Sequence, residues 1–304
     1  MPIWIVITVG SAFLQNIRSS LQKYLKGRMG TTGATFVRFG FGLPVAATLY
    51  ALLRLVGHAA PSPNMTFLGW VVVAAMAQII AQALLVHLFS YRNFAVGTAY
   101  SRTEPAQAAL FGILFLGEGF GPGGWAAVAL TVFGVMLISL ARSAFTIGGL
   151  VTGLFTPTAG IGLASGLFFG VAAVGYRAAS LSIEPSLPSP DFMIQASFVL
   201  LWAIALQTVT MAIWMALRER HEFAAVARAW KPSMLVGLVG ALASFGWFAA
   251  MTLQQAALVK SLAQIEMLFT FASTVLIFRE RVTAREVIGC IFIVTGIVVL
   301  LITR

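Results

Sequence analysis

Hydrophobic residues follow one another along this chain in runs of about twenty, and short segments between the runs hold most of the charged and turn-forming residues. A run of about twenty apolar residues crosses the hydrocarbon core of a bilayer as one α-helix. The pattern therefore predicts an all-α membrane protein without a separate soluble domain. Its ten predicted spans are residues 3–24, 32–54, 66–89, 95–116, 122–141, 157–178, 192–217, 233–252, 257–278 and 284–302.

The second half of the chain repeats a feature of the first half. Glu104 and Glu118 lie near the start and at the end of the fourth predicted span, and Glu266 and Glu280 hold the same places in the ninth. A shift of 162 residues superimposes both pairs without a gap. A carboxylate inside an apolar span costs about 3 kcal/mol or more, so its recurrence at one depth indicates an internal duplication. The predicted domains are 1–142 and 143–304, with five spans each.

The segments around these glutamates carry a family resemblance. The pattern "SRTEPAQAALFGILFLGEGF", with "AQIEMLFTFASTVLIFRERV" in the second half, resembles the paired EamA domains of the drug/metabolite transporter superfamily. The resemblance covers essentially the whole chain. It departs where the second copy has Met267 in place of Pro105, and where the first copy lacks a counterpart of Arg281.

The resemblance implies ten transmembrane helices in two inverted five-helix repeats around a central cavity. It also implies export of small metabolites, and it extends to amino-acid exporters, including exporters of aromatic amino acids. Five is an odd number of spans, so two such copies insert with opposite orientation, an arrangement that supports alternating access.

The orientation of the termini has two interpretations. Lys and Arg gather at the odd-numbered connections between spans, for example Arg279, Arg281 and Arg285, and the positive-inside rule then places both termini outside the cytoplasm. Families of this type are often drawn with both termini inside.

Polar side chains share faces of several predicted spans, and these are the candidate substrate-binding residues. A polar group in mid-span is costly unless it faces protein or water. The candidates are Gln15, Gln78, Gln82, Tyr100, Glu104, Gln107, Ser244, Trp247 and Gln264. Amides and carboxylates can bind the charged groups of an amino acid, and the Tyr100 and Trp247 rings suit an aromatic or hydrophobic side chain. Hydrogen bonding between helices is the alternative role.

Four ionisable residues inside the spans are candidates for coupling or charge recognition: Glu104, Glu266, Arg38 and Lys260. The solute gradient, or a proton taken up by Glu104 or Glu266, has to drive transport. Arg38 either extends toward the span end, pairs with Glu104 or holds a substrate carboxylate. Lys260 either extends to the interface or binds an anion.

Other residues are predicted to have structural roles. Glu118 and Glu280 each precede the next span, where the positive end of a helix favours a carboxylate. Pro105 lacks a backbone N–H and opens its helix. In the second span Gly40, Gly42 and Pro44 let neighbouring helices approach and allow a bend.

Glycines mark two spans that contain no interior charge. Gly134 lies in the fifth span, and Gly289 and Gly296 lie in the tenth. Small residues let neighbouring helices approach closely. These two spans are predicted to be peripheral packing helices or a dimer face.

Composition excludes several classes of protein. The chain is 60% hydrophobic and 9% charged, whereas soluble domains have roughly 25% charged residues. Its net charge of +10 comes mostly from span ends, which indicates lipid headgroups as partners and no nucleic acid. The single Cys290 and the scattered His58, His87 and His221 predict neither a disulfide nor a metal site. A phosphate-binding GxxxxGK loop does not occur in the sequence, so ATP does not drive the process.

Together these observations predict a secondary transporter of a bacterial inner membrane, without cofactor or metal, that is a monomer or a homodimer. Its expected substrate is a small metabolite, an amino acid with a preference for aromatic or hydrophobic ones, exported by alternating access. Export of other metabolites or drugs is the alternative. A channel, a membrane sensor and an intramembrane enzyme are the less favoured classes. The isolated acidic residues and the histidines unpaired in sequence argue against an enzyme.

Overall fold

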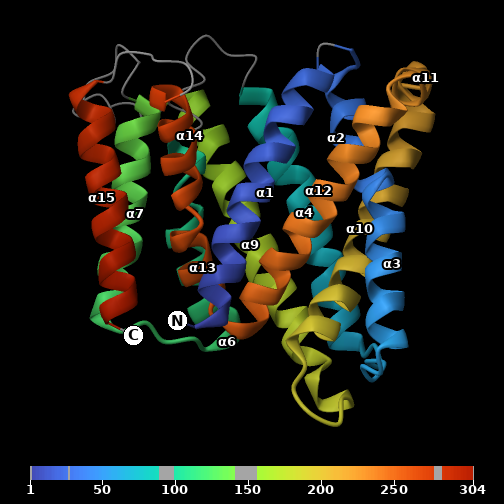
Figure 1. Ribbon diagram of the computed structural model, residues 1–304, viewed down its shortest axis with the longest axis horizontal. Helices are drawn as coiled ribbons and strands as arrows, with labels where there is room; N and C mark the ends of the chain where they lie inside the picture. Colours follow the sequence, from blue (N-terminus) through green and yellow to red (C-terminus); the bar gives the residue numbers. More distant parts are fainter. Residues whose placement is uncertain (1, 27, 89–98, 141–155, 277–282, 304) are drawn as a thin grey trace. The chain divides into compact units, whose positions relative to one another are not determined.

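In the computed structural model the chain is helical throughout the residues that the structure describes, which are all except 1, 27, 89–98, 141–155, 277–282 and 304 (Figure 1). The apolar runs fold as predicted, because a helix satisfies its backbone hydrogen bonds internally. The elements are α1 (Ile3–Lys26), α2 (Thr31–Gly40), α3 (Gly42–Leu55), α4 (Met65–Leu88), α6 (Glu104–Leu116), α7 (Pro122–Leu140), α9 (Pro157–Ser182), the 3₁₀ turn η1 (Glu184–Ser186), α10 (Phe192–Arg218), α11 (His221–Arg228), α12 (Trp230–Leu253), α13 (Ala256–Leu262), α14 (Ile265–Leu276) and α15 (Ala284–Ile302).

Seven helical segments of the described chain are long and apolar enough to cross a membrane: 31–55, 65–85, 122–140, 157–186, 192–218, 230–253 and 284–302. The first predicted span, α1, is outside this set because Gln15, Asn16 and Arg18 lower its hydropathy. The fourth is outside it because α6 has 13 residues, and the ninth because it is divided into α13 and α14. Ten spans with inverted repeats therefore stay a prediction.

The helices form two compact units that do not follow the order of the sequence. Unit 1 consists of Met1–Met76 and Gly175–Leu253, and unit 2 of Ala77–Val174 and Gln254–Arg304. Each unit combines helices from both halves of the chain. The predicted repeats 1–142 and 143–304 are therefore not separate compact bodies, and their boundary stays a prediction.

In unit 1, glycines of α12 bring other helices close. A Cβ at Gly246 would lie 2.0 Å from Ser11 Oγ of α1, and one at Gly237 would lie 2.5 Å from the backbone of Phe41. Phe41 is also the residue at which the second span is interrupted, between α2 and α3. This one-residue break lies between Gly40 and Gly42, where the sequence allows a bend, and the bend itself stays a prediction.

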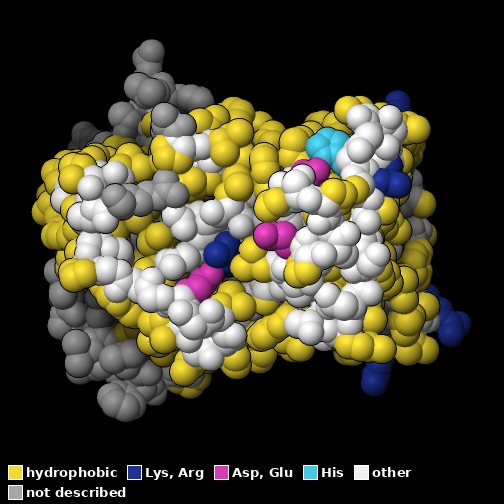
Figure 2. Space-filling model, turned by 90° about the horizontal axis from the view of Figure 1, so that it is seen from below, with side chains coloured by type: hydrophobic (Ala, Val, Ile, Leu, Met, Phe, Trp, Pro, Cys, Tyr) yellow, Lys and Arg dark blue, Asp and Glu magenta, His cyan; other side chains and the backbone are white. Residues whose placement is uncertain are grey.

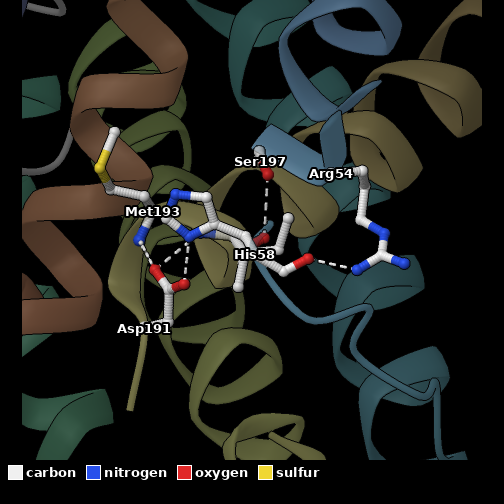
Figure 3. A network of polar contacts seen from close by, with 6 residues as sticks. Arg54, His58, Asp191, Met193 and Ser197 are labelled. Atoms are coloured by element: carbon white, nitrogen blue, oxygen red, sulfur yellow. Dashed lines mark hydrogen bonds and ion pairs between the residues drawn. The ribbon is translucent and has the colours of Figure 1, made fainter. Parts of the chain in front are cut away.

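One end of unit 1 is held by a polar network that Figure 3 shows. Asp191 caps α10 by accepting hydrogen bonds from the backbone N–H groups of Met193 (3.1 Å) and Ile194 (3.3 Å). The same carboxylate pairs with the His58 ring, and Arg54 donates to the His58 carbonyl. The network ties the segment after α3 to the start of α10.

In unit 2, α7 and α15 lie side by side (Figure 1) with their glycines in contact. A Cβ at Gly134 would lie 2.6 Å from the Gly289 carbonyl oxygen, and one at Gly289 would lie 2.7 Å from the Gly134 carbonyl oxygen. Gly296 meets Thr131 in the same way, with a distance of 3.0 Å from its added Cβ to the Thr131 nitrogen. The glycines of the fifth and tenth spans thus let these two helices pack against each other, and a dimer face on either helix stays a prediction.

Many large hydrophobic side chains stay exposed, as expected for a surface that contacts lipid. Val209, Ile213 and Leu217 of α10 lie one turn apart along one face and are 56%, 55% and 71% exposed. Figure 2 shows a face on which hydrophobic side chains predominate and charged ones are few. These features fit a multi-pass membrane protein.

Candidate functional site

Two helices of unit 2 are interrupted at corresponding places. In the fourth span, residues 102–103 form a turn before α6 begins at Glu104. In the ninth span, residues 263–264 form a turn between α13 and α14, and Glu266 is in the first turn of α14. The shift of 162 residues that superimposes the two glutamates also brings the two turns into register within one residue.

Short-range backbone hydrogen bonds hold both interruptions. Arg102 and Thr103 donate their N–H groups to carbonyls three residues earlier, at 3.1 Å each. Glu266 and Met267 do the same in the second copy, at 3.0 and 2.9 Å. A single 3₁₀-type turn inside a longer helix often marks a functional hinge.

The two interruptions have different causes. Pro105 lies in the first turn of α6 and has no N–H to donate to the Ser101 carbonyl, so the helix cannot continue regularly there. The second copy has Met267 in the corresponding place and forms its turn without a proline. Tertiary packing must therefore hold the second turn, in which Gln264 is buried.

An ion pair connects the two interrupted spans. Lys260 Nζ of α13 lies 2.8 Å from Glu104 Oε1 of α6, and the two side chains are 21% and 18% exposed. Lys260 is in the last turn of α13, and Glu104 is the first residue of α6. Each charge thus lies at the helix end whose partial charge is opposite to its own, which stabilises both.

Polar side chains from neighbouring helices surround the start of α6. Gln107 donates to Thr103 Oγ1 at 2.8 Å and to the Leu163 carbonyl of α9 at 3.4 Å. The Ser101 and Ser165 hydroxyls are 3.2 Å apart, and Ser165 donates to the Ala81 carbonyl of α4 at 3.0 Å. The ion pair thus adjoins a network that also includes α9 and α4.

Tyr100 has a different environment from the one predicted. It is 4% exposed and belongs to a hydrophobic cluster with Ala99, Leu140 and Ala159. Phe111, one turn beyond Gln107 on α6, stacks on Phe115 with ring centroids 5.9 Å apart. Phe111 therefore offers a ring on the face of α6 that carries Glu104 and Gln107.

Four predicted residues meet in pairs in unit 1. The Trp247 indole N–H donates to Gln15 Oε1 at 3.0 Å, and Arg38 donates to Ser244 Oγ at 3.3 Å. Ser244 and Trp247 are both on α12, so this helix contacts the candidates of the first and second spans.

The remaining candidates lie in unit 2. Gln78 and Gln82 are half-buried on α4, and Glu266 is half-buried on α14. Glu118 lies just beyond α6, and its carboxylate folds back onto Gly112, 3.0 Å from a Cβ added there. Glu280 lies outside the described residues.

Sequence reasoning missed the partners of the charged candidates. Lys260 was predicted to extend toward the interface or to bind an anion, and Arg38 was one suggested partner of Glu104. The structure pairs Glu104 with Lys260. It also buries Arg18 of the first span, which is not among the candidate residues.

Comparison with known families decides the class of protein. The EamA-like transporter family matches residues 2–140 and 156–302, which is most of the chain. The chain belongs to the EamA-like transporter family. This EamA-like protein is therefore a multi-pass membrane protein and a secondary transporter, and members of the family are not enzymes.

Comparison with solved structures agrees with the fold of an EamA-like protein. One crystal structure of a protein with 17% sequence identity matches with a TM-score of 0.72, over 100% of this chain and 99% of its own. At this identity the likeness shows the fold alone. No curated protein matches the chain.

Proposed function

We propose that this EamA-like protein exports amino acids, preferentially aromatic or hydrophobic ones, across a bacterial inner membrane by alternating access. The observation that carries the proposal is the Glu104–Lys260 ion pair between two interrupted helices. The ammonium group of an amino acid has the same charge and donor geometry as Lys260. It can therefore compete with Lys260 for the Glu104 carboxylate.

The hinges beside this pair support a conformational role. Release of Lys260 from Glu104 removes the ion pair between the start of α6 and the end of α13, which are also packed against each other. Each helix then turns at its own 3₁₀ interruption, next to the released charge. Discontinuous helices at substrate sites have this role in many secondary transporters.

The preference for apolar side chains rests on the surroundings of the ion pair. Phe111 lies two turns beyond Glu104 on the same face of α6 and is half-buried. An aromatic or aliphatic side chain on the solute would find apolar contacts there, whereas a second charged group would not.

Transport into liposomes tests the proposal. Purified protein reconstituted into liposomes is offered radiolabelled phenylalanine, leucine, serine and aspartate, with and without a pH step across the membrane. Saturable uptake of phenylalanine and leucine above that of serine and aspartate is expected. Uptake of none of these amino acids, by protein that is correctly folded, would refute amino-acid export and favour another metabolite or a drug.

The Glu104→Gln variant tests proton coupling in the same liposomes. Where a proton drives transport by neutralising Glu104, the pH step accelerates the wild type and has no effect on the variant. Glu118→Gln, which changes a carboxylate at the other end of α6, is the matched control and keeps the wild-type response. Retention of the full pH response by Glu104→Gln would exclude Glu104 as the proton carrier.

A further inference from the structure

Gly166 of α9 packs against the interruption of the fourth span in unit 2. A Cβ added to Gly166 would lie 2.9 Å from the Ser101 carbonyl oxygen and 3.4 Å from Gln107 Oε1. One turn further along α9, a Cβ at Gly170 would lie 3.1 Å from the backbone nitrogen of Ala108. The two glycines thus bring α9 close to α6, and two oxygen atoms approach one point beside Gly166.

Both oxygens lack their usual hydrogen-bond donor within the described part of the chain. In a regular helix the Ser101 carbonyl would accept from the N–H group four residues later, and Pro105 has no N–H. Gln107 Oε1 is buried and accepts no hydrogen bond from any described residue. A buried acceptor without a partner costs about 1–3 kcal/mol. A ligand that satisfies both oxygens removes this cost.

Neighbouring groups fix the orientation of the Gln107 amide. Its Nε2 donates to Thr103 Oγ1 at 2.8 Å and to the Leu163 carbonyl at 3.4 Å. The Thr103 hydroxyl itself donates to the Tyr100 carbonyl at 2.7 Å, so its oxygen acts as an acceptor toward the amide. The reversed amide would place its oxygen against two acceptors. Gln107 therefore keeps Oε1 available to a ligand.

Two buried hydroxyl groups belong to residues of the same contact. Ser101 and Ser165 are 6% and 0% exposed, and their hydroxyl oxygens are 3.2 Å apart. Ser165 directly precedes Gly166, and its hydroxyl donates to the Ala81 carbonyl of α4 at 3.0 Å. Because its proton is used there, the Ser165 oxygen keeps its capacity to accept. The surroundings of Gly166 are thus rich in neutral oxygens.

Neutral carbonyl, amide and hydroxyl oxygens are suitable ligands for a small hard cation. Carbonyls of interrupted helices coordinate Na⁺ in many secondary transporters, and the Ser101 carbonyl lies at the end of a helical segment. A divalent ion would need carboxylate ligands, and the nearby Glu104 is already paired with Lys260. The space has the size of one missing methyl group, which favours Na⁺ over the larger K⁺. The sequence argues only against metals held by His or Cys, which Na⁺ does not require.

We propose that the Ser101 carbonyl, Gln107 Oε1 and the two serine hydroxyls bind a Na⁺ ion beside Gly166. The inference goes beyond the proposed function and does not depend on which solute the protein moves. The ion connects Ser101, before the interruption, to Gln107, after it. Its binding therefore stabilises the turn at residues 102–103, through which a Na⁺ gradient can act on transport.

Ion binding to the purified protein tests the site without any transport step. Full-length protein in a nonionic detergent is kept at constant ionic strength while NaCl or KCl replaces choline chloride. Na⁺ should raise the melting temperature in a saturable way, because an ion that binds only the folded protein stabilises it, and K⁺ should do so only at higher concentration. Radiolabelled Na⁺ should bind with the same half-saturation. Equal effects of Na⁺, K⁺ and choline up to several hundred millimolar would overturn the proposal.

Variants at the contact locate the ion. Gln107→Leu removes Oε1 and should weaken Na⁺ binding about tenfold or more. Gly166→Ala places a Cβ 2.9 Å from the Ser101 carbonyl oxygen and should weaken it at least as much. Gly160→Ala on the same helix is the matched control and should bind Na⁺ as the wild type does, because a Cβ at Gly160 meets nothing within 4 Å. Wild-type affinity in both Gln107→Leu and Gly166→Ala would overturn the site.

The melting temperature in choline chloride separates a ligand role from a structural one. Gln107→Leu loses two hydrogen bonds of the amide but also removes a buried unpaired oxygen, so its stability without Na⁺ should change little. A large loss of stability together with a wild-type response to Na⁺ would show that Gln107 is structural and would overturn the site. Where Gln107→Leu does not fold, Ser101→Ala and Ser165→Ala carry the test, and wild-type Na⁺ affinity in both would overturn the site as well.

Binding in the absence of any solute distinguishes a free ion from the ammonium group of an amino acid. Saturable Na⁺ binding to the solute-free protein supports a free ion. Absence of Na⁺ binding, together with phenylalanine binding that Gln107→Leu abolishes, would assign the oxygens to the ammonium group and overturn the Na⁺ site. Intact Na⁺ binding by a protein that moves no amino acid would refute the proposed function alone.

Discussion

Removal of either partner of the Glu104–Lys260 pair leaves the other charge buried beside a helix end. At the 2.8 Å separation of Nζ and Oε1, an effective dielectric constant of about 20 gives an attraction of about 6 kcal/mol. Desolvation of two groups that are only 18% and 21% exposed offsets most of this attraction. We expect a coupling energy of about 1–3 kcal/mol between the two side chains.

A double-mutant cycle measures this coupling. The free energy of unfolding in detergent is determined for the wild type, Glu104→Gln, Lys260→Gln and the double variant. The double variant should lose about 1–3 kcal/mol less stability than the sum of the losses of the two single variants. The cycle of Glu118→Gln with Lys260→Gln is the control and should be additive within about 0.5 kcal/mol, since the Glu118 carboxylate folds onto Gly112, about 12 Å along α6 from Glu104.

A charge swap tests the contribution of the helix ends. Glu104→Lys combined with Lys260→Glu restores the attraction but places each charge at the helix end of the same sign. The swapped protein should therefore recover only part of the lost stability and stay about 1–4 kcal/mol below the wild type, because each end loses a favourable interaction and gains an unfavourable one. Additive single variants, or full recovery in the swap, would refute the account of this pair.

Two further predictions concern packing and capping. Gly289→Leu should separate α15 from α7 and destabilise the protein by about 1–3 kcal/mol or more, because the leucine side chain meets the Gly134 carbonyl. Thermal unfolding measures the loss, and Gly69→Leu is the control, because a Cβ at Gly69 meets nothing within 4 Å. Asp191→Ala should cost about 1 kcal/mol through loss of the α10 cap and its contact with His58, and an unchanged melting temperature would contradict the capping role.

The sequence predicted most helix limits well because hydrophobic length and turn residues decide them locally. The predicted span 122–141 corresponds to Pro122–Leu140, and the prediction of 284–302 coincides with Ala284–Ile302. A capping box of Thr283 and Glu286 begins α15. Each of these features depends on residues within one or two helical turns.

The interruptions were predictable only in part. Pro105 indicated an opened helix in the fourth span, and a turn lies there. No comparable signal precedes Met267, so only the duplication could have suggested the second turn. Such a turn depends on packing against other helices, which composition does not reveal.

The partners of the charged residues depend on contacts between distant parts of the chain. Glu104 meets Lys260, and Arg18 and Arg38 meet at Gly240, because helices from both halves of the chain belong to one unit. Hydrophobic periodicity gives the face on which each residue lies but not the helix that it contacts. The site residues were therefore predictable one by one, and their pairs were not.

Counterflow tests the central claim, alternating access to an amino-acid site, most directly. Liposomes that contain the purified protein are loaded with unlabelled phenylalanine, and uptake of a trace of radiolabelled phenylalanine from outside is followed. The account predicts a transient accumulation of label above equilibrium, because internal phenylalanine speeds the return of the binding site to the outer face. The same accumulation should be strongly reduced in Lys260→Gln. Uptake that internal phenylalanine does not accelerate, and that does not saturate, would indicate a channel and contradict the account.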